Sequence, residues 1–395
     1  MNLALEIWPV TLTAILASML SIKVLRPIAI KFNLVDSPDH RKHHQGQIPL
    51  IGGLTIFAGL VLGALLITIF LPDTATTTKL FVLLGTSAII LTMGLVDDYK
   101  NLGAKFRFII QSIACLIMIA STGIYVKTVG GIAGFGEVSL GIWGIPFTVL
   151  AVVGFINALN MMDGIDGLAG GISLMSIFAI LVFQFVSGNF VHVDKLLLLA
   201  AVIVPYMASN LGLFGMKKIF LGDAGSMLIG YLLAWTFIIL TQSKQPSVIP
   251  IHALWCVAIP LLDMWAVMFK RMLKGQSPLK ADRGHLHHLF LSYGIGSEKT
   301  LAYILALAGC MIAVGVFTYW FIPTYDFYVF LGVMLTYTVI NHYFDVRRPI
   351  QKTLIQAASN QKASNQPIYQ PESVKHQLKQ DDFAVAPESL EREAS

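Results

Sequence analysis

Eleven apolar runs of 17 to 22 residues constrain this chain more than any other feature. A helix needs about 20 apolar residues to cross the ~30 Å hydrocarbon core of a membrane, so each run is a candidate span. Only 12% of the residues are charged, against roughly 25% in a typical soluble domain. This pattern excludes a soluble enzyme and a nucleic-acid-binding domain, and it predicts an all-α, polytopic integral membrane protein. The predicted spans cover residues 4–22, 50–70, 79–96, 106–122, 141–158, 168–187, 195–213, 224–241, 248–269, 300–320 and 326–344.

Lysine and arginine are divided unequally between the two sides of the predicted membrane. The loops after spans 1, 3, 5, 7 and 9, together with the C-terminal region, hold 23 of the 27 basic residues. The opposite loops hold the other four, which are Lys79, Lys127, Lys195 and Lys244. Because loops rich in lysine and arginine stay in the cytoplasm, we expect the N-terminus outside and the C-terminus inside. Residues 1–345 are then the membrane domain, and the polar residues 346–395 are a cytoplasmic, mostly disordered tail.

Aspartates gather on the predicted cytoplasmic side, at the ends of spans. The first group is Asp97-Asp98, at the end of the third span. Adjacent carboxylates repel each other, so the pKa of one is raised unless a cation neutralises the pair. The alternative is a solvated helix end beside Lys100 and Lys105.

The second group follows the fifth span, in a loop without lysine or arginine. Asp163 and Asp166 are three residues apart, so a helical turn places both on one face with Asn160. The spacing excludes an EF-hand, which needs ligands at alternate positions and a glutamate at position twelve. Because this loop has no lysine or arginine to pair with them, two aspartates are poorly explained by a structural role. The pattern therefore favours a functional site.

The third group is the segment 217–226, which contains Gly222, Asp223 and Gly225 just before the eighth span. Glycines at the start of a helix are typical of a backbone cradle for phosphate. Taken alone, Asp223 has a simpler explanation as the N-cap of that helix.

The fourth group lies in the longest internal loop, where His285, His287 and His288 follow Lys270 and Arg271. Three histidines are candidate zinc ligands, but no cysteine lies nearby. The surrounding cations favour binding of an anion such as a diphosphate. A fifth, basic segment, residues 36–53, fits contact with a lipid phosphate or a plain cytoplasmic anchor.

Taken together, these segments resemble the polyprenyl-phosphate N-acetylhexosamine-1-phosphate transferase family over about residues 1–345. The motifs that carry the resemblance are Asp97-Asp98, Asn160-x-x-Asp163-Gly-x-Asp166-Gly-Leu, Phe220-x-Gly-Asp223-Ala-Gly-Ser and Asp282-Arg-x-His285-x-His287-His288. The enzymes of this family that make lipid I typically show three consecutive histidines and a Pro-Thr-Met-Gly-Gly segment. Here the patterns are His-x-His-His and Pro49-Leu-Ile-Gly-Gly, which favours the branch that uses N-acetylglucosamine.

The resemblance implies a reaction between UDP-GlcNAc and undecaprenyl phosphate that yields undecaprenyl-diphospho-GlcNAc and UMP. This is the first lipid-linked step of a cell-surface polysaccharide such as O antigen or enterobacterial common antigen. It also implies a bacterial inner-membrane protein with its active site on the cytoplasmic face, with homodimers common in the family. Both substrates are anionic, so Mg²⁺, with Mn²⁺ as a second candidate, is expected to neutralise the diphosphate.

The resemblance also suggests a role for each site residue. Asp223 and Asn160 would hold the metal, because hard cations prefer oxygen ligands. Asp97, Asp98 and Asp163 would be catalytic, with one of the first two orienting or deprotonating the lipid phosphate. The substrate-binding residues would be Asp166, Asn210, Phe220, Arg271, His285, His287 and His288. Direct transfer and a phospho-aspartate intermediate are both compatible with these residues.

Other functions remain as alternatives. The same chemistry on a different UDP-N-acetylhexosamine, as in lipid I synthesis or with UDP-GalNAc, fits the same motifs. A membrane prenyltransferase also uses aspartates and Mg²⁺, but it leaves the histidines unexplained. A transporter places ionisable residues at mid-membrane, whereas the one acid clearly inside a predicted span is Asp263.

Overall fold

The structure is a computed structural model that describes residues 3–36, 46–70, 74–133, 135–243, 246–277 and 284–364. Helices dominate it: α1 (Leu3–Lys31), α2 (Gly52–Phe70), α3 (Thr74–Lys100), α4 (Ala104–Thr122), α5 (Gly144–Met162), α6 (Leu168–Ser187), α7 (Val193–Asn210), α8 (Gly222–Gln242), α9 (Pro250–Cys256), α10 (Ala258–Leu273), α11 (Leu286–Ser292), α12 (Ser297–Phe321) and α13 (Asp326–Ser364). Two antiparallel hairpins pair β1 (Val35–Asp36) with β2 (Ile48–Pro49) and β3 (Thr128–Ile132) with β4 (Gly136–Ser139).

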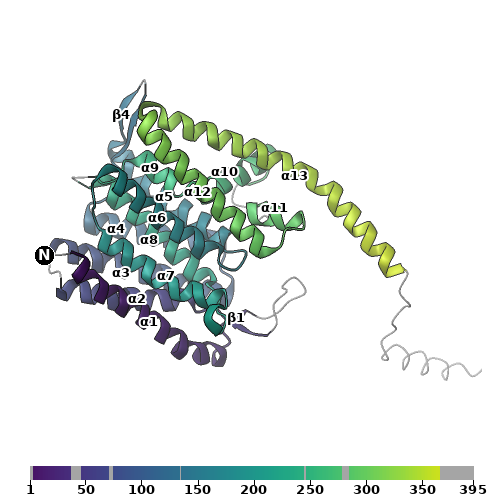
Figure 1. The fold of residues 1–395 in the computed structure, drawn as a ribbon, viewed down its shortest axis with the longest axis horizontal. Coiled ribbons are helices and arrows are strands. Elements are labelled where there is room, and N and C mark those ends of the chain that lie inside the picture. Colours follow the sequence, from purple (N-terminus) through teal and green to yellow (C-terminus); the bar gives the residue numbers. More distant parts are fainter. Residues whose placement is uncertain are drawn as a thin grey trace, which may run out of the picture. The chain divides into compact units, whose positions relative to one another are not determined.

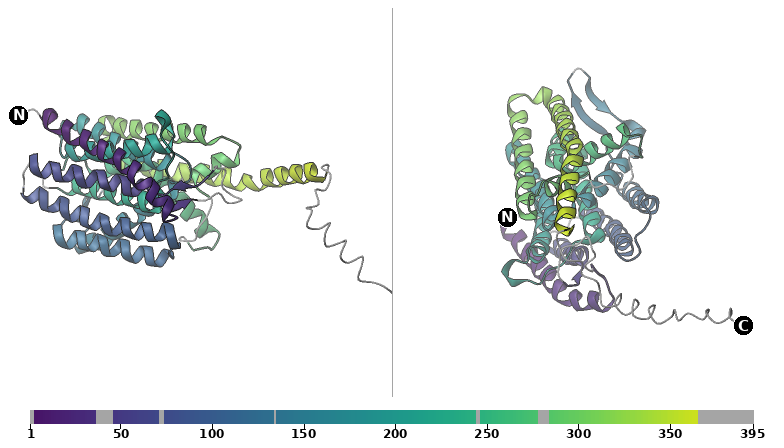
Figure 2. Two further views of the ribbon diagram at one scale, coloured as in Figure 1. Left: turned by 90° about the horizontal axis from the view of Figure 1, so that it is seen from below. Right: turned by 90° about the vertical axis from the view of Figure 1, so that its right-hand side faces the viewer.

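The predicted fold class is confirmed. Among the described residues, ten helices are long and apolar enough to cross a membrane, and α9 with α10 makes up to eleven. Between residues 3 and 345, the long helices run side by side, as Figures 1 and 2 show. The chain is therefore a multi-pass membrane protein. Which terminus faces the cytoplasm stays a prediction from the lysine and arginine distribution.

The predicted ninth span, 248–269, is not one continuous helix. α9 and α10 meet at Val257 with a bend of 83°. Pro260 has no N–H to donate to the carbonyl of Cys256, so the helical hydrogen bonds of α9 cannot continue through this point. The bend separates Trp255 and Cys256 from the half-span that carries Asp263 and Lys270.

Two other helices run beyond their predicted ends. α1 continues to Lys31, through Pro27, where the sequence predicted a loop after residue 22. α13 continues to Ser364. Contacts divide the chain after Asp345, and Val346–Ser395 is a separate unit. The disorder predicted for the tail falls mainly on residues 365–395, which lie outside the described part.

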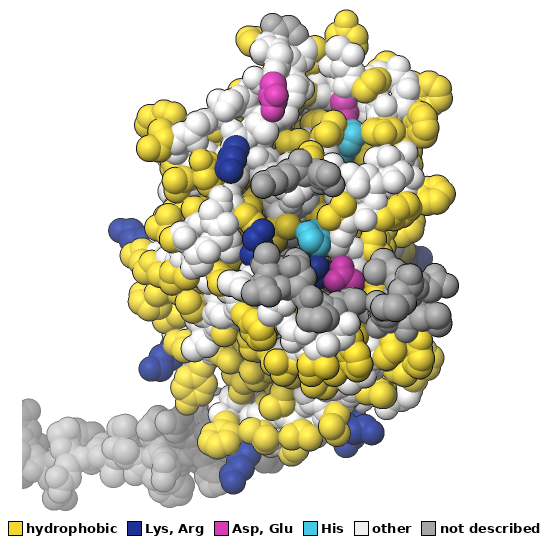
Figure 3. Space-filling model, turned by 90° about the vertical axis from the view of Figure 1, so that its left-hand side faces the viewer, with side chains coloured by type: hydrophobic (Ala, Val, Ile, Leu, Met, Phe, Trp, Pro, Cys, Tyr) yellow, Lys and Arg dark blue, Asp and Glu magenta, His cyan; other side chains and the backbone are white. Residues whose placement is uncertain are grey.

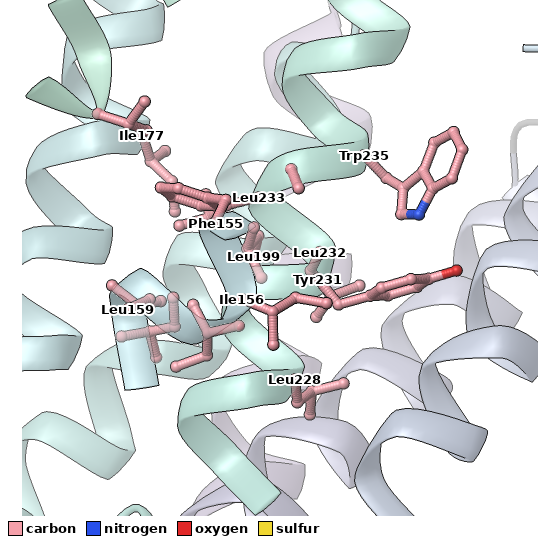
Figure 4. Packing of buried hydrophobic residues seen from close by; sticks show 14 of the residues in the cluster. Phe155, Ile156, Leu159, Ile177, Leu199, Leu228, Tyr231, Leu232, Leu233 and Trp235 are labelled. Carbon is pink, nitrogen blue, oxygen red and sulfur yellow. The ribbon is translucent and has the colours of Figure 1, made fainter. Parts of the chain in front are cut away.

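The centre of the membrane domain is α8, which is buried along nearly its whole length. Its neighbours are α2, α3 and α5. Figure 4 shows Phe155, Ile156 and Leu159 of α5 close to Leu228, Tyr231 and Leu232 of α8. Because α8 is buried along most of its length and packs mainly through apolar side chains, the position of Asp223 in its first turn is fixed within the bundle.

Small residues let the backbones around α8 approach closely. A Cβ on Gly230 would lie 2.9 Å from the Cα of Ile156, and a Cβ on Gly94 would collide with the backbone of Ala224. Close packing through small residues is typical of membrane helices, because lipid gives no hydrophobic drive to associate them. The Gly94 contact presses the end of α3, with Asp98, against the start of α8.

Candidate active site

The end of α3 and the start of α8 are joined by the carboxylate of Asp98. It accepts hydrogen bonds from the backbone N–H groups of Asp223 (2.7 Å) and Ala224 (3.1 Å). Gly222 has a φ of 72°, and a Cβ there would lie 2.7 Å from Asp98 Oδ2. The predicted phosphate cradle at this helix start is therefore wrong for these two N–H groups, because a carboxylate of the protein already accepts them.

The neighbouring carboxylate, Asp97, is buried and lies beside the side chain of Asp223. It accepts hydrogen bonds from the backbone N–H of Leu102 (2.6 Å) and from Arg107 Nη1 (2.8 Å). These contacts fix the turn between α3 and α4. Both of its oxygens bind protein groups, so Asp97 helps to position this turn; its catalytic role stays a prediction.

Asn160 and Asp223 meet between the end of α5 and the start of α8. Asn160 Nδ2 donates to Asp223 Oδ1 (2.8 Å) and to Ser226 Oγ (2.9 Å). The fold thus brings the two predicted metal ligands together. The carboxylate of Asp98 lies beside them, bound to the backbone N–H groups of Asp223 and Ala224. Ser226 is a partner that sequence reasoning missed.

Asp163 follows directly after α5 and is half-buried. Loss of contact with water, and then the negative charges of Asp223, Asp98 and Asp166, raise its pKa from 3.8 to about 8. Within the described residues, its carboxylate forms no hydrogen bond or ion pair. Asp163 is therefore the carboxylate of this group that is available to a cation or a substrate.

The residues predicted to bind the nucleotide lie beside this group. Asp166 forms an ion pair with Lys218, whose Nζ lies 5.5 Å from the ring centroid of Phe220. The backbone of Phe220 pairs with the start of α2: its N–H donates to the carbonyl of Pro49 (2.9 Å), and its carbonyl accepts from Gly52 (3.0 Å). An aromatic ring, a cation and a carboxylate are together suited to a nucleotide.

Asn210 lies under this surface. Its Oδ1 accepts from the N–H of Gly167 (2.7 Å) and its Nδ2 donates to the carbonyl of Ile219 (2.9 Å). The side chain is buried. A direct contact of Asn210 with substrate is therefore not supported: both ends of the amide hold the loop of Asp166 against the segment of Phe220.

The histidine segment reaches the same site through His287. His287 is buried against Gly164 so closely that a Cβ on Gly164 would collide with the imidazole. The rings of His287 and His288 have centroids 4.1 Å apart. The structure thus places the histidine segment beside the loop that carries Asp163 and Asp166. Residues 278–283, which include Asp282, lie outside the described residues, as do residues 37–45 of the fifth group.

His285 is held by an acid that sequence reasoning did not place in the site. Its Nδ1 lies 2.8 Å from Oδ2 of Asp263, whose Oδ1 accepts from the N–H of Leu286 (2.8 Å) and from Tyr337 (3.3 Å). His285 is buried, and so is Arg271 at the end of α10. His285 is best described as a positioning residue; contact of Arg271 with a diphosphate stays a prediction.

Comparison with known proteins agrees with this arrangement. Residues 80–241 match glycosyl transferase family 4, a stretch that contains the groups at Asp98, Asp163 and Asp223. The chain is 38% identical over 302 residues to the undecaprenyl-phosphate alpha-N-acetylglucosaminyl 1-phosphate transferase of Yersinia pestis, covering 76% of this chain and 81% of that protein. The chain belongs to glycosyl transferase family 4. Proteins with the same name from Escherichia coli O157:H7 (36% identity; 79% of this chain, 84% of that protein) and Haemophilus influenzae (37%; 76% and 84%) are similarly close. The resemblance seen in the motifs is thereby confirmed.

The donor atoms of this family 4 site fit a hard divalent cation. Asp163, Asp223 and Asn160 offer carboxylate and amide oxygens, and the carboxylate of Asp163 forms no hydrogen bond or ion pair with the described residues. Within the described residues, no three acids, histidines or cysteines form a ready metal site. The oxygen donors suit Mg²⁺, which usually binds one or two carboxylates and completes its shell with water and substrate phosphates.

Proposed function

We propose that this protein transfers GlcNAc-1-phosphate from UDP-GlcNAc to undecaprenyl phosphate. A phosphate oxygen of the lipid forms a bond to the β-phosphorus of UDP-GlcNAc, the bond from that phosphorus to the bridging oxygen breaks, and UMP leaves. The observation that carries the proposal is the hydrogen bond of 2.8 Å between Asn160, at the end of α5, and Asp223, at the start of α8, which brings the loop of Asp163 to the same place. The names of the relatives give the same substrates.

The residues divide the work of binding two anionic substrates. Asp223, Asp163 and Asn160 would hold Mg²⁺, which when bound neutralises phosphate charge and favours in-line transfer. Phe220 and Lys218 would face the uridine, with Asp166 fixing Lys218. His287 and His288 would donate to the diphosphate. Asp98 and Asp97 would hold the start of α8 and the α3–α4 turn, so that Asp223 is in place before substrate arrives. A direct catalytic role of either residue at the lipid phosphate stays a prediction.

The assay for this proposal follows radiolabelled GlcNAc from UDP-GlcNAc into a butanol-extractable lipid. Transfer that requires added undecaprenyl phosphate supports the proposal. A prenyltransferase or a transporter would give no labelled lipid. Faster transfer from UDP-GalNAc than from UDP-GlcNAc would identify GalNAc as the preferred sugar. We also propose that the product starts a cell-surface polysaccharide of the O antigen type.

Magnesium affinity should depend on pH because a proton competes for Asp163. Its pKa of about 8 lies above the ordinary value of 3.8, so below pH 8 most of the carboxyl is protonated and cation binding must release that proton. We expect the apparent Kd for Mg²⁺ to fall about tenfold per pH unit from pH 6 to 8 and then level off. Isothermal titration in two buffers of different ionisation enthalpy measures the released proton. An affinity that is constant between pH 6 and 8, or the same slope in Asp163→Asn, would contradict this assignment.

We propose that the site faces the cytoplasm in the bacterial inner membrane, as the distribution of lysine and arginine predicts. A cysteine pair tests this. Tyr99, near Asp98, is 63% exposed, and Phe135, in the β3–β4 turn, is 78% exposed. In a Cys310→Ser background, which removes the one exposed native thiol, an impermeant maleimide on intact cells should label Phe135→Cys and not Tyr99→Cys. The reverse pattern would place the site outside.

A further inference from the structure

A cavity lies at the end of the bundle opposite the carboxylates of the proposed active site. It has a volume of about 390 Å³, within the range of ligand pockets, and lies among α2, α3, α7 and α8. Gln242 and Ser243, at the end of α8, line it. Asp223 lies about 20 residues earlier on the same helix, which corresponds to roughly 30 Å at 1.5 Å per residue. The cavity is therefore separate from the proposed active site.

Most of the lysines on this side of the protein lie at the mouth of the cavity. Lys79, Lys127 and Lys195 all line it, and they are three of only four basic residues in the loops predicted to lie outside. The fourth, Lys244, lies outside the described residues. Figure 3 looks onto the end of the bundle that carries the β3–β4 hairpin, where basic side chains and a histidine gather near the middle of a largely hydrophobic face. Three of the few cations on this side thus converge on one cavity.

The positive charge at the mouth is incompletely compensated. Within the described residues, Asp194 is the one acid that forms an ion pair with these lysines, at 3.2 Å from Lys195. Lys195 Nζ also lies 3.0 Å from His192 Nδ1. Loss of water and then the charges of Lys195 and Lys79 lower the pKa of His192, which places both cations near the same point. Of the three lysines that line the cavity, Lys195 is thus paired with Asp194, and Lys79 and Lys127 form no ion pair with an acid among the described residues.

The walls of the cavity have the opposite character. Behind the lysines it is lined mainly by aliphatic side chains, among them Leu83, Leu84, Leu196, Leu199, Leu232 and Ile239. A small soluble anion gains nothing from such walls, and a neutral lipid gains nothing from the lysines. A molecule with a hydrocarbon chain and an anionic head matches both features.

We propose that this cavity binds a lipid phosphate, with its head at Lys79, Lys127 and Lys195 and its chain among the leucines of α3, α7 and α8. The lysines carry their charge at the ends of flexible stems and so reach a head group at the membrane surface. An anionic phospholipid and a polyprenyl phosphate of the same leaflet share this chemistry. The site would be distinct from the lipid-substrate site at the carboxylates and does not depend on the proposed reaction.

The experiment titrates the delipidated full-length protein in detergent with three probes and counts bound lipid by native mass spectrometry. The probes are dioleoylphosphatidylglycerol, dioleoylphosphatidylcholine and a polyprenyl monophosphate. We compare wild type with the variant Lys79→Gln, Lys127→Gln, Lys195→Gln. A matched control, Lys23→Gln, Lys31→Gln, Lys299→Gln, removes the same charge from exposed lysines that do not line the cavity. Lipid bound at the carboxylates contributes equally to wild type and variant, so the difference in the number of bound lipids reports on the cavity alone.

We expect the triple variant at the cavity to bind phosphatidylglycerol or the polyprenyl phosphate about 10²-fold more weakly, since each of the three lysines near an anionic head group contributes on the order of 1 kcal/mol. The control variant should match wild type, and phosphatidylcholine should bind equally to all three. If the lysine variant loses binding of only one of these two lipids, phosphatidylglycerol or the polyprenyl phosphate, that lipid is the natural ligand of the cavity.

A second variant tests the chain-binding part without changing charge. Thr236 lines the cavity, and its hydroxyl bonds only within its own helix, to the carbonyl of Leu232. Thr236→Trp should fill the cavity and remove the same lipid, with the melting temperature of the lipid-free protein unchanged. Equal affinity for anionic and zwitterionic lipid in wild type, or full binding in the lysine variant, would overturn the proposal.

Discussion

Replacing Asp223 with asparagine is expected to abolish transferase activity in a protein that still folds. Asparagine keeps an oxygen that can accept the hydrogen bond from Asn160 Nδ2, so the contact between α5 and α8 is preserved. The negative charge that would hold Mg²⁺ is lost. Loss of a metal carboxylate costs several kcal/mol of charge stabilisation, so we expect at least a ~10²-fold lower kcat/KM.

The measurement is lipid product formed per minute at saturating UDP-GlcNAc across a range of Mg²⁺ concentrations. Glu298→Gln is the matched control, because Glu298 is exposed in the first turn of α12 and takes no part in the site. It should behave as wild type. Near wild-type turnover of Asp223→Asn at limiting Mg²⁺ would refute the role of Asp223.

Replacing Asp163 with asparagine is expected to have opposite effects on activity and stability. Asp163 is the carboxylate of the group without a protein partner among the described residues, so its loss should lower kcat by ~10²-fold or more. Its folded-state pKa of about 8 lies above the ordinary 3.8. The carboxyl therefore favours the folded state at pH values below 3.8, and this contribution is lost as the pH rises through 8.

An asparagine side chain at this position cannot ionise and so avoids that loss. At pH 8 with EDTA, Asp163→Asn should melt at the same temperature as wild type or higher, while remaining inactive with Mg²⁺. The difference in melting temperature should shrink as the pH is lowered toward 4. A large drop in melting temperature at pH 8, with activity falling only in proportion to the unfolded fraction, would make Asp163 a structural residue instead.

The sequence predicted the spans well because the membrane imposes a length on each apolar run. The break at Val257 was missed because the residues on both sides of it are equally apolar. Pro260 is the one sequence signal of the break, and a single proline does not by itself show that a span is interrupted. The prediction also ended the first span at residue 22, before the end of α1 at Lys31, because charged residues at a membrane surface are compatible with a continuing helix as well as a loop.

The site was predictable as a set of segments and less so as individual roles. Scarce aspartates at the ends of spans identified the groups around Asp98, Asp163 and Asp223. Sequence spacing could not reveal which atoms are already used by the protein: Asp97 binds Arg107, and Asn210 binds two backbone groups. These partners come from other segments, so only the folded arrangement distinguishes a residue that holds the site from one that is open to substrate.

Asp263 and Lys218 were the informative omissions. A lone acid inside an apolar run needs a buried partner, and His285 supplies one at 2.8 Å. The sequence shows that a partner is needed, but the fold is required to show which residue provides it. Lys218 was counted only as a basic residue of a loop, although its position two residues before Phe220 leaves it over that ring.

The central claim, transfer of a phosphosugar, is tested most directly by following both labels of one substrate. Purified protein is supplied with undecaprenyl phosphate, Mg²⁺ and UDP-GlcNAc that carries ³²P in the β-phosphate and ¹⁴C in the sugar. The account predicts that both labels enter the butanol-extractable lipid in equal amounts, that UMP is released in the same amount, and that Asp223→Asn forms neither product. Lipid that carries ¹⁴C without ³²P, with release of UDP, would contradict it.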